Sequence, residues 1–189
     1  MELQNTPMER TAEMNTLVSG LVNTETTAAV RGFPIPYYPI DYAFFGVNTA
    51  VSGVAYNTAK ALTVLGDGVR LASMTGKDYA ASYILESLRA MGISTDHIQP
   101  KLQQTPASVV LYDHEGKRQI YCDLKDIRET LYDFTPARLD GIDLVVACNI
   151  NFNRPLLRLA KEAGKVIATD VHVLGNIYDD YNREFRLSA

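Results

Sequence analysis

The sequence predicts an α/β protein built on a parallel sheet flanked by helices. Two observations lead to this fold class. Strand-like apolar segments and amphipathic helical segments alternate along the chain, as expected of parallel strands joined by helices. Residues 142–148 also form a nearly continuous apolar run, which is typical of a strand buried on both faces. A chain of 189 residues suits one domain with a sizeable core.

The composition excludes several function classes. A net charge of −4 argues against binding to nucleic-acid phosphates. No apolar run approaches the roughly 20 residues that span a membrane, and no secretory signal is visible. We therefore expect a cytoplasmic protein with neither nucleic-acid nor membrane partners. Cys122 and Cys148 lie in apolar strand-like runs, which predicts reduced core residues rather than a disulfide or a metal site.

The first strand is predicted to deliver two polar side chains to a site. Residues 1–14 are polar and unpatterned, and we interpret them as a flexible leader. Residues 15–22 form a strand candidate that is followed by Asn23 and Glu25 in a polar cluster. Ligands bind beyond the carboxyl ends of parallel strands, so these side chains are placed to reach a ligand. A capped loop is the alternative interpretation.

A β flap outside the main sheet is predicted for residues 27–51. Three prolines between residues 34 and 39 exclude a helix and a central strand, and residues 40–47 are aromatic and strand-like. The aromatic side chains of the flap either stack on a base or pack the flap itself, and packing is favoured. They are Tyr37, Tyr38, Phe44 and Phe45.

The segment that follows the flap predicts a helix with an unusual first turn. Ser52 is a suitable N-cap, and Gly53 lets the backbone approach a ligand closely. Asn57 places an amide one turn into the helix. Two interpretations are therefore open: the first turn binds a ligand, or the segment is an ordinary core helix. An apolar stripe runs along this helix to Gly66, a suitable C-terminal stop. The stripe comprises Ala55, Ala59, Leu62 and Leu65.

A strand at 69–74, the turn Gly76-Lys77-Asp78 and a second helix come next. Asp78 is predicted to cap that helix, which Gly92 ends. Its apolar stripe indicates core packing, and it comprises Ala81, Ile84, Leu85, Leu88 and Met91.

A hairpin is predicted within residues 104–122, with strands at 107–112 and 117–122. An isolated hairpin is only marginally stable, so we expect it to join the flap in one small sheet, a lid formed by residues 27–51 and 104–122.

The buried strand at 142–148 is followed by Asn149, Asn151 and Asn153, and the last of these is expected to cap a helix. A further strand at 165–170 brings Asp170 to the same edge of the sheet. We place Asn149, Asn151 and Asp170 in a secondary group of candidate site residues. His172 next to Asp170 lacks a third ligand at a fitting spacing, so no metal site is predicted.

These motifs, in this order, resemble the N-terminal part of the ribokinase-like (PfkB) carbohydrate and nucleoside kinases. The resemblance covers residues 15–189. The family's Asn-x-Asp motif reads Asn23-Thr24-Glu25 here, and its Gly-Gly-(x)3-Asn sugar-binding motif reads Ser52-Gly53-(x)3-Asn57. The family's Gly-x-Asp helix opening matches Gly76-Lys77-Asp78. The resemblance implies a three-layer ribokinase-like domain, incomplete at its C-terminal side, with Asn23, Glu25, Gly53 and Asn57 as substrate-binding residues.

The resemblance further implies a kinase that transfers the γ-phosphate of ATP, with Mg²⁺, to a sugar or nucleoside hydroxyl. The family's Gly-Ala-Gly-Asp and Asn-x-x-Glu motifs do not occur in this chain, so we assign it no catalytic or metal residue and expect the chain alone to be inactive. A homodimer through the lid is also expected.

Two other classes of protein are considered. One is a non-catalytic sugar- or nucleoside-binding or regulatory relative that lacks the ATP site. A reading frame that continues into a Gly-Ala-Gly-Asp segment would favour the kinase over this alternative. The other is an unrelated dinucleotide-binding protein, which is disfavoured because no Gly-x-Gly-x-x-Gly follows the first strand.

Overall fold

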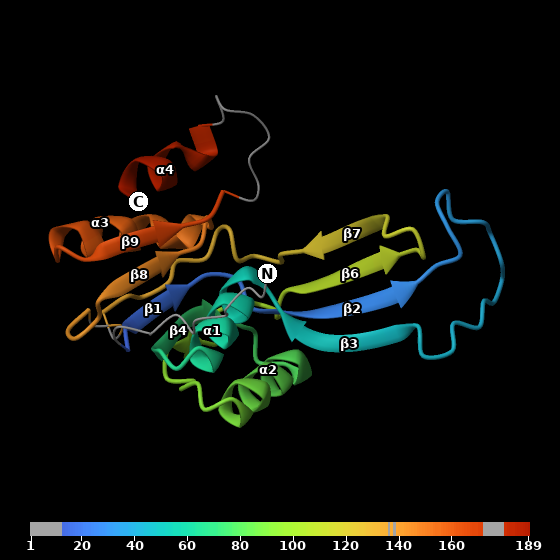
Figure 1. Cartoon of the computed structure of the whole chain (residues 1–189), viewed down its shortest axis with the longest axis horizontal. Helices are drawn as coiled ribbons and strands as arrows, with labels where there is room; N and C mark the ends of the chain where they lie inside the picture. The colour runs from blue at the N-terminus through green and yellow to red at the C-terminus, as the bar shows by residue number, and fades with distance from the viewer. Residues whose placement is uncertain (1–12, 136, 138, 172–179) are drawn as a thin grey trace, which may run out of the picture.

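The computed structural model describes residues 13–135, 137, 139–171 and 180–189. Most of the predicted leader, residues 1–12, and His172 lie outside the described residues. The strands form a main sheet and a smaller sheet that projects from it, which Figure 1 shows on the left and right respectively.

The main sheet has five parallel strands in the order β5-β4-β1-β8-β9. The central strand β1 pairs with β4 on one side and with β8 on the other, so that Leu17 lies between Arg70 and Val145. The parallel α/β sheet predicted from the alternating segments is therefore confirmed. The strands are β1 (Asn15–Ser19), β4 (Gly68–Met74), β5 (Ile98–Gln99), β8 (Leu144–Ala147) and β9 (Val166–Thr169).

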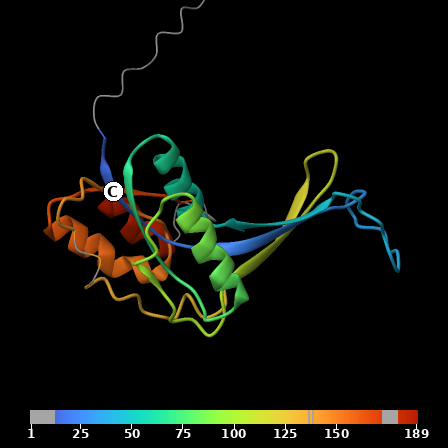
Figure 2. The ribbon, with the colours of Figure 1, turned by 90° about the horizontal axis from the view of Figure 1, so that it is seen from below.

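Helices cover both faces of the main sheet and make a three-layer domain. Helices α1 (Val54–Val64) and α2 (Tyr79–Ala90) pack on one face, in a core that includes Val18 of β1. Helices α3 (Arg154–Glu162) and α4 (Arg183–Ser188) pack on the other face, in a core that includes Leu17. Figure 2 shows these two pairs of helices on opposite sides of the strands. Short 3-10 helices precede α3 and α4, at Asn151–Asn153 and Asp180–Asn182.

The smaller sheet, called the lid sheet below, has the strand order β3-β2-β6-β7. Strand β2 is antiparallel to β3 and parallel to β6, and β6 and β7 form the predicted hairpin. The hairpin therefore joins the flap in one sheet, as expected. The strands are β2 (Asn23–Ala29), β3 (Val47–Ser52), β6 (Ala107–Tyr112) and β7 (Arg118–Asp123).

The structure corrects three expectations for residues 23–51. The polar cluster that begins at Asn23 is strand β2 and not the capped loop of the alternative interpretation, because β3 and β6 satisfy its backbone on both sides. Residues 40–46 form no strand, and the flap strand begins only at Val47. The aromatic side chains of the flap pack it only in part. Tyr38 lies under the Arg31 guanidinium and Phe44 stacks on Tyr42, whereas Tyr37 is 88% exposed and Phe45 is fully exposed.

Two details of α1 also differ from the prediction. Gly53 occupies the N-cap position without any side-chain cap, because Ser52 is still the last residue of β3. Leu65 is 61% exposed rather than packed inward. Ten residues at 3.6 per turn rotate Leu65 about 80° away from Ala55, which takes it off the buried face of α1.

Helix α2 follows its prediction closely. Asp78 is its N-cap and accepts a hydrogen bond from the Ala81 N–H at 2.9 Å, and Ala81, Ile84 and Leu88 are buried. No helix within the described ranges is both long and apolar enough to cross a membrane.

Candidate functional site

The candidate site lies where the main sheet meets the lid sheet. The chain passes from β1 to its neighbour β4 and only later reaches β8 on the other side of β1, so the strand order reverses at β1. Ligands of open parallel sheets bind beyond the carboxyl ends of the strands at such a reversal. The segment that leaves β1 at this edge, residues 20–22, leads directly to Asn23, the first residue of β2.

Two glycines let the backbone converge at this edge. A Cβ on Gly20 would lie 2.6 Å from Cβ of Cys148, the residue that follows β8. A Cβ on Gly53 would lie 2.4 Å from the carbonyl oxygen of Leu21, which accepts a hydrogen bond from the Ala55 N–H at 3.2 Å. Gly53 was expected to make room for a ligand, but the close neighbour that it admits is the segment between β1 and β2.

A side-chain hydrogen-bond chain joins β2 to β6. Asn23 Nδ2 donates to Ser108 Oγ at 3.1 Å, and Ser108 Oγ donates to Glu25 Oε2 at 3.4 Å. Glu25 and Ser108 are direct partners in the parallel ladder, and Asn23 and Glu25 are two residues apart on one strand. All three side chains therefore lie on one face of the lid sheet. The structure brings the predicted residues Asn23 and Glu25 together through Ser108.

The Asn23 side chain leaves one polar atom unsatisfied. Asn23 is only 3% exposed, and its Oδ1 is buried without a hydrogen-bond partner in the described part of the chain. An unpaired buried oxygen costs about 1–3 kcal/mol relative to a paired one, so a donor supplied at this point would be stabilising.

Asn57 lies on the first turn of α1, exposed to solvent. Its backbone N–H donates to the Gly53 carbonyl at 2.9 Å, but its side chain has no hydrogen bond within the described part of the chain. Ser52, next to Gly53, pairs with Asn23 across the β2–β3 ladder. The start of α1 and the start of β2 are therefore adjacent, and Asn57 is free to contact a ligand there.

The secondary group of candidate residues is split. The Asn149 N–H donates to Asp170 Oδ2 at 3.3 Å, so these two residues meet at the carboxyl edge as predicted. The Asn149 side chain contacts the C-terminal segment, since its Nδ2 donates a hydrogen bond to Asn182 Oδ1 at 2.5 Å. Asn151 instead donates to the Arg128 carbonyl at 3.3 Å and belongs to a different contact.

Asn153 does not cap α3 through its side chain, contrary to prediction. It is fully buried, and its Nδ2 donates to the carbonyl oxygens of Ser19 and Cys148 at 2.7 and 2.8 Å. The preceding 3-10 turn aims the amide at the ends of β1 and β8 instead of at the helix N–H groups. Asn153 therefore ties these two strand ends together beneath the candidate site.

The two thiols differ in their surroundings. Burial raises the pKa of Cys148 to about 12, and the residue is only 3% exposed, as expected of a core cysteine. Cys122 is exposed, which contradicts the prediction, because every residue of the edge strand β7 is exposed. Cys122 pairs with Ser108 in the β6–β7 ladder and lies near Glu25. Desolvation still raises its thiol pKa.

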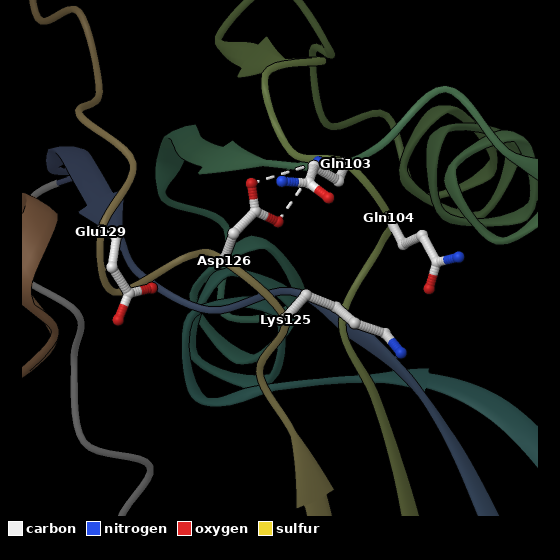
Figure 3. A pocket seen from close by; sticks show the side chains of 5 residues that line it. All are labelled: Gln103, Gln104, Lys125, Asp126 and Glu129. Atoms are coloured by element: carbon white, nitrogen blue, oxygen red, sulfur yellow. Dashed lines mark hydrogen bonds between the residues drawn. The ribbon is translucent and has the colours of Figure 1, made fainter.

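A polar pocket of about 590 Å³ opens at the base of the lid sheet, between the segment that enters β6 and the segment that leaves β7. Figure 3 shows its side chains, with the Asp126 carboxylate accepting two hydrogen bonds from the Gln103 N–H. Asp126 thus has a structural role that joins the two segments. The pocket is lined by Gln103, Gln104, Lys125, Asp126 and Glu129.

Among the residues that the structure describes, no three His, Cys, Asp or Glu side chains gather as a metal ion requires. We assign none of the described carboxylates to ATP or Mg²⁺.

Ser108 and Cys122 were missed as site neighbours by sequence reasoning. Side chains alternate along both hairpin strands, but the predicted four-residue turn would pair Ser108 with residue 121; the five residues 113–117 that connect the strands in the structure pair it with Cys122 instead. That alternation does not give the register of β6 against β2, which brings Ser108 to Glu25.

The fold is that of a three-layer α/β protein whose lid sheet adjoins the carboxyl edge of a parallel main sheet. Within this class, the chain belongs to the pfkB family of carbohydrate kinases, whose family model matches residues 15–150. No curated protein sequence matches the chain.

Solved structures with the same fold include three kinases. A microbiome-derived acarbose kinase matches with a TM-score of 0.80 and 24% identity, over 92% of this chain and 58% of that one. Arabidopsis thaliana ribokinase, solved with ribose and ATP, matches with a TM-score of 0.69 and 18% identity, over 85% of this chain and 54% of the ribokinase. A Burkholderia thailandensis nucleoside kinase, solved with inosine, matches with a TM-score of 0.66 and 18% identity, over 82% of this chain and 52% of the kinase. This chain therefore spans somewhat more than half the length of these relatives.

Proposed function

We propose that this chain forms the acceptor-binding part of a sugar or nucleoside kinase. The observation that carries the proposal is the hydrogen-bonded face of Asn23, Ser108 and Glu25 beside the carboxyl edge of the main sheet. It carries the Glu25 carboxylate, an acceptor for sugar hydroxyl groups, and beside it the Asn23 amide oxygen, which is buried and has no partner among the described residues. Membership of the pfkB family supports a hydroxyl acceptor.

Four residues are proposed to contact the acceptor: Asn23, Glu25, Gly53 and Asn57. Asn23 and Glu25 accept hydrogen bonds from its hydroxyl groups, and Asn57 approaches from the start of α1. Gly53 contributes by allowing α1 to begin against residues 21 and 22. The lid sheet shields the reacting hydroxyl from water. Asn149, Asn151 and Asp170 are proposed as more distant neighbours of the site.

The intact family member is proposed to transfer the γ-phosphate of ATP, with Mg²⁺, to the bound hydroxyl. Phosphoryl transfer depends on positioning, metal ions and electrostatic stabilisation of the phosphoryl group. This chain's own residues are assigned only the first of these tasks, for the acceptor. We expect the 189-residue chain alone to turn over no ATP. A sugar or nucleoside phosphate formed by this chain would contradict that expectation.

We also propose a homodimer through the lid sheet, in the cytoplasm. Apolar side chains stand exposed on the sheet and on the loop between β2 and β3, and burying them is favourable. They include Ile40, Tyr42, Phe44, Val47, Ile120 and Tyr121. Sedimentation of the purified chain, compared with a variant that carries Ile120→Lys and Tyr121→Lys, tests this proposal.

Acceptor binding is tested by calorimetric titration with ribose, inosine and acarbose, the compounds associated with the three structurally similar kinases. We expect at least one of them to bind, and Asn57→Ala to weaken that binding about tenfold. Lys60→Ala, an exposed change on the same helix, serves as control and should leave affinity unchanged. Unchanged affinity in Asn57→Ala would remove Asn57 from the site.

A second readout locates the ligand. Cys122 is the ladder partner of Ser108, so a bound acceptor should slow its alkylation by iodoacetamide. Equal rates with and without a ligand that binds would place the ligand away from this face.

A further inference from the structure

The polarity of the hydrogen-bond chain on the lid sheet follows from the chemistry of its three groups. A carboxylate only accepts hydrogen bonds, so the single hydroxyl hydrogen of Ser108 must point to Glu25 Oε2. The Ser108 oxygen then faces Asn23 with its lone pairs. Asn23 must turn its NH₂ group to Ser108, as the 3.1 Å contact from Nδ2 shows.

We propose that Ser108 is a positioning residue that fixes the Asn23 amide with its carbonyl oxygen available, so that the site accepts hydrogen bonds only from ligand groups that donate them. This inference rests on the proposed function, because it concerns how the acceptor site selects hydroxyl groups. Ser108 acts through Asn23 and Glu25 and is not a catalytic residue.

Burial makes this arrangement rigid. Asn23 and Ser108 are 3% and 6% exposed, so water does not compete for their mutual hydrogen bond. Asn23 Oδ1 is buried without a donor among the described residues, and a ligand hydroxyl that enters beside Glu25 and displaces the groups covering this oxygen would supply one. The adjacent Ser52 side chain forms no hydrogen bond to the Asn23 side chain, although Ser52 is the ladder partner of that residue. The orientation of the amide therefore depends on Ser108.

The direction of these hydrogen bonds determines which ligand groups the site can bind. A hydroxyl group donates to the carbonyl oxygen of Asn23, whereas fluorine or hydrogen in its place cannot. With Ser108 replaced by alanine, the amide is released and can present either its NH₂ group or its oxygen. Discrimination between a hydroxyl group and its fluoro analogue should then fall. Threonine in place of Ser108 keeps the hydroxyl group and should retain the discrimination.

The first test needs no ligand. The side-chain ¹⁵N–¹H resonances of Asn23, assigned by their loss in Asn23→Asp, are recorded for the wild type, Ser108→Ala and Ser108→Thr. We expect two sharp, well-separated Asn23 proton signals in the wild type and in Ser108→Thr. Ser108→Ala should shift or broaden both signals. Ser87→Ala is the control, because its hydroxyl bonds only the Tyr83 carbonyl within α2. Unchanged Asn23 signals in Ser108→Ala would overturn the proposal.

The second test measures selectivity. D-Ribose is titrated beside its 2-deoxy-2-fluoro and 3-deoxy-3-fluoro analogues into the same three proteins. We expect one fluoro analogue to bind the wild type and Ser108→Thr about tenfold more weakly than ribose, and Ser108→Ala to reduce that ratio to about threefold or less. An equal ratio in the wild type and in Ser108→Ala would overturn the role of Ser108.

The two proposals fail separately. If ribose, inosine and acarbose all fail to bind, the proposed function is lost, and with it the role of Ser108 in selecting a ligand. If any of them binds while the Asn23 resonances are the same in the wild type and in Ser108→Ala, only the positioning role of Ser108 is lost. Glu25→Gln provides an independent variant, because a glutamine amide no longer fixes the direction of the Ser108 hydroxyl and should broaden the Asn23 signals as well.

Discussion

Ser19 and Asn153 hold each other through a pair of reciprocal hydrogen bonds, although 134 residues separate them. Ser19 Oγ donates to Asn153 Oδ1 at 2.5 Å, and Asn153 Nδ2 donates to the Ser19 carbonyl oxygen at 2.7 Å. Both residues are fully buried. The pair fixes the carboxyl end of β1 against the turn that precedes α3, directly beneath the candidate site.

Asn153→Ala should therefore destabilise the fold by about 2–3 kcal/mol, because it leaves buried polar groups of Ser19 and Cys148 without their partner. Urea unfolding measures the change. Asn151→Ala is the matched control: that side chain makes one 3.3 Å bond and is half-buried, so its cost should stay below about 1 kcal/mol. Equal losses in the two variants would show that the Ser19 pair adds no stability.

Gly53→Ala should cost about 3 kcal/mol or more. Gly53 has a φ of +106° and a ψ of 149°, a region in which residues other than glycine are strained, and a Cβ would meet the Leu21 carbonyl oxygen at 2.4 Å. Gly92 also has a positive φ, of +74°, but a Cβ there meets nothing within 4 Å. Gly92→Ala should therefore cost only about 1–2 kcal/mol. Thermal unfolding of both variants checks the order, and a Gly53→Ala variant as stable as Gly92→Ala would contradict it.

Asp78 should make the stability of the protein sensitive to acid. Burial raises the pKa of Asp78, but hydrogen bonds from Thr105 and from the Ala81 N–H outweigh it and hold the pKa below its ordinary value. A lowered pKa stabilises the folded protein at pH values above the unfolded pKa of about 3.9, and this contribution is lost as the pH falls through the lower folded pKa.

Asp78→Ala should thus lose about 1–2 kcal/mol at pH 7 through the missing cap of α2. The difference from the wild type should shrink as the pH falls below about 4. Urea titrations at pH 7 and pH 3 measure it. A difference that stays constant between these pH values would refute a role for the ionised carboxylate.

The two thiols should react at very different rates. Cys122 is exposed, whereas Cys148 is buried and its pKa is raised to about 12 by burial. Iodoacetamide at pH 8 should modify Cys122 alone in the folded protein and both cysteines in urea. Peptide mass spectrometry identifies the modified residue, and Cys122→Ser should abolish the native reaction. Labelling of Cys148 in the folded chain at a rate similar to that of Cys122 would be evidence against the buried position.

Local signals explain which elements could be predicted. Helix α2 has an N-cap at Asp78, a periodic apolar face and a terminating glycine, and all three lie within 15 residues of sequence. The β6–β7 hairpin has a five-residue connection, residues 113–117, in which Gly116 takes a positive φ of 83°. Such elements follow from neighbours along the chain.

Strand β2 lacked such signals, because its sequence Asn-Thr-Glu-Thr-Thr-Ala-Ala is mostly polar. Its strand conformation comes from pairing with β3 and β6, which begin 24 and 84 residues later. For the same reason, sequence reasoning found Asn23 and Glu25 as candidates but not Ser108, which joins them.

From the amino-acid sequence alone follow the main-sheet strands β1, β4, β8 and β9 with their helices α1 to α3, the family motifs and the position of Asn23, Glu25, Gly53 and Asn57 along the chain. Periodicity, caps and turns are local, so one chain suffices to read them. Only the tertiary structure decided which side chains meet: Ser108 with Asn23, Asn153 with Ser19, and Leu21 with Gly53. These contacts depend on strand register and on the packing of distant segments, which no local pattern specifies.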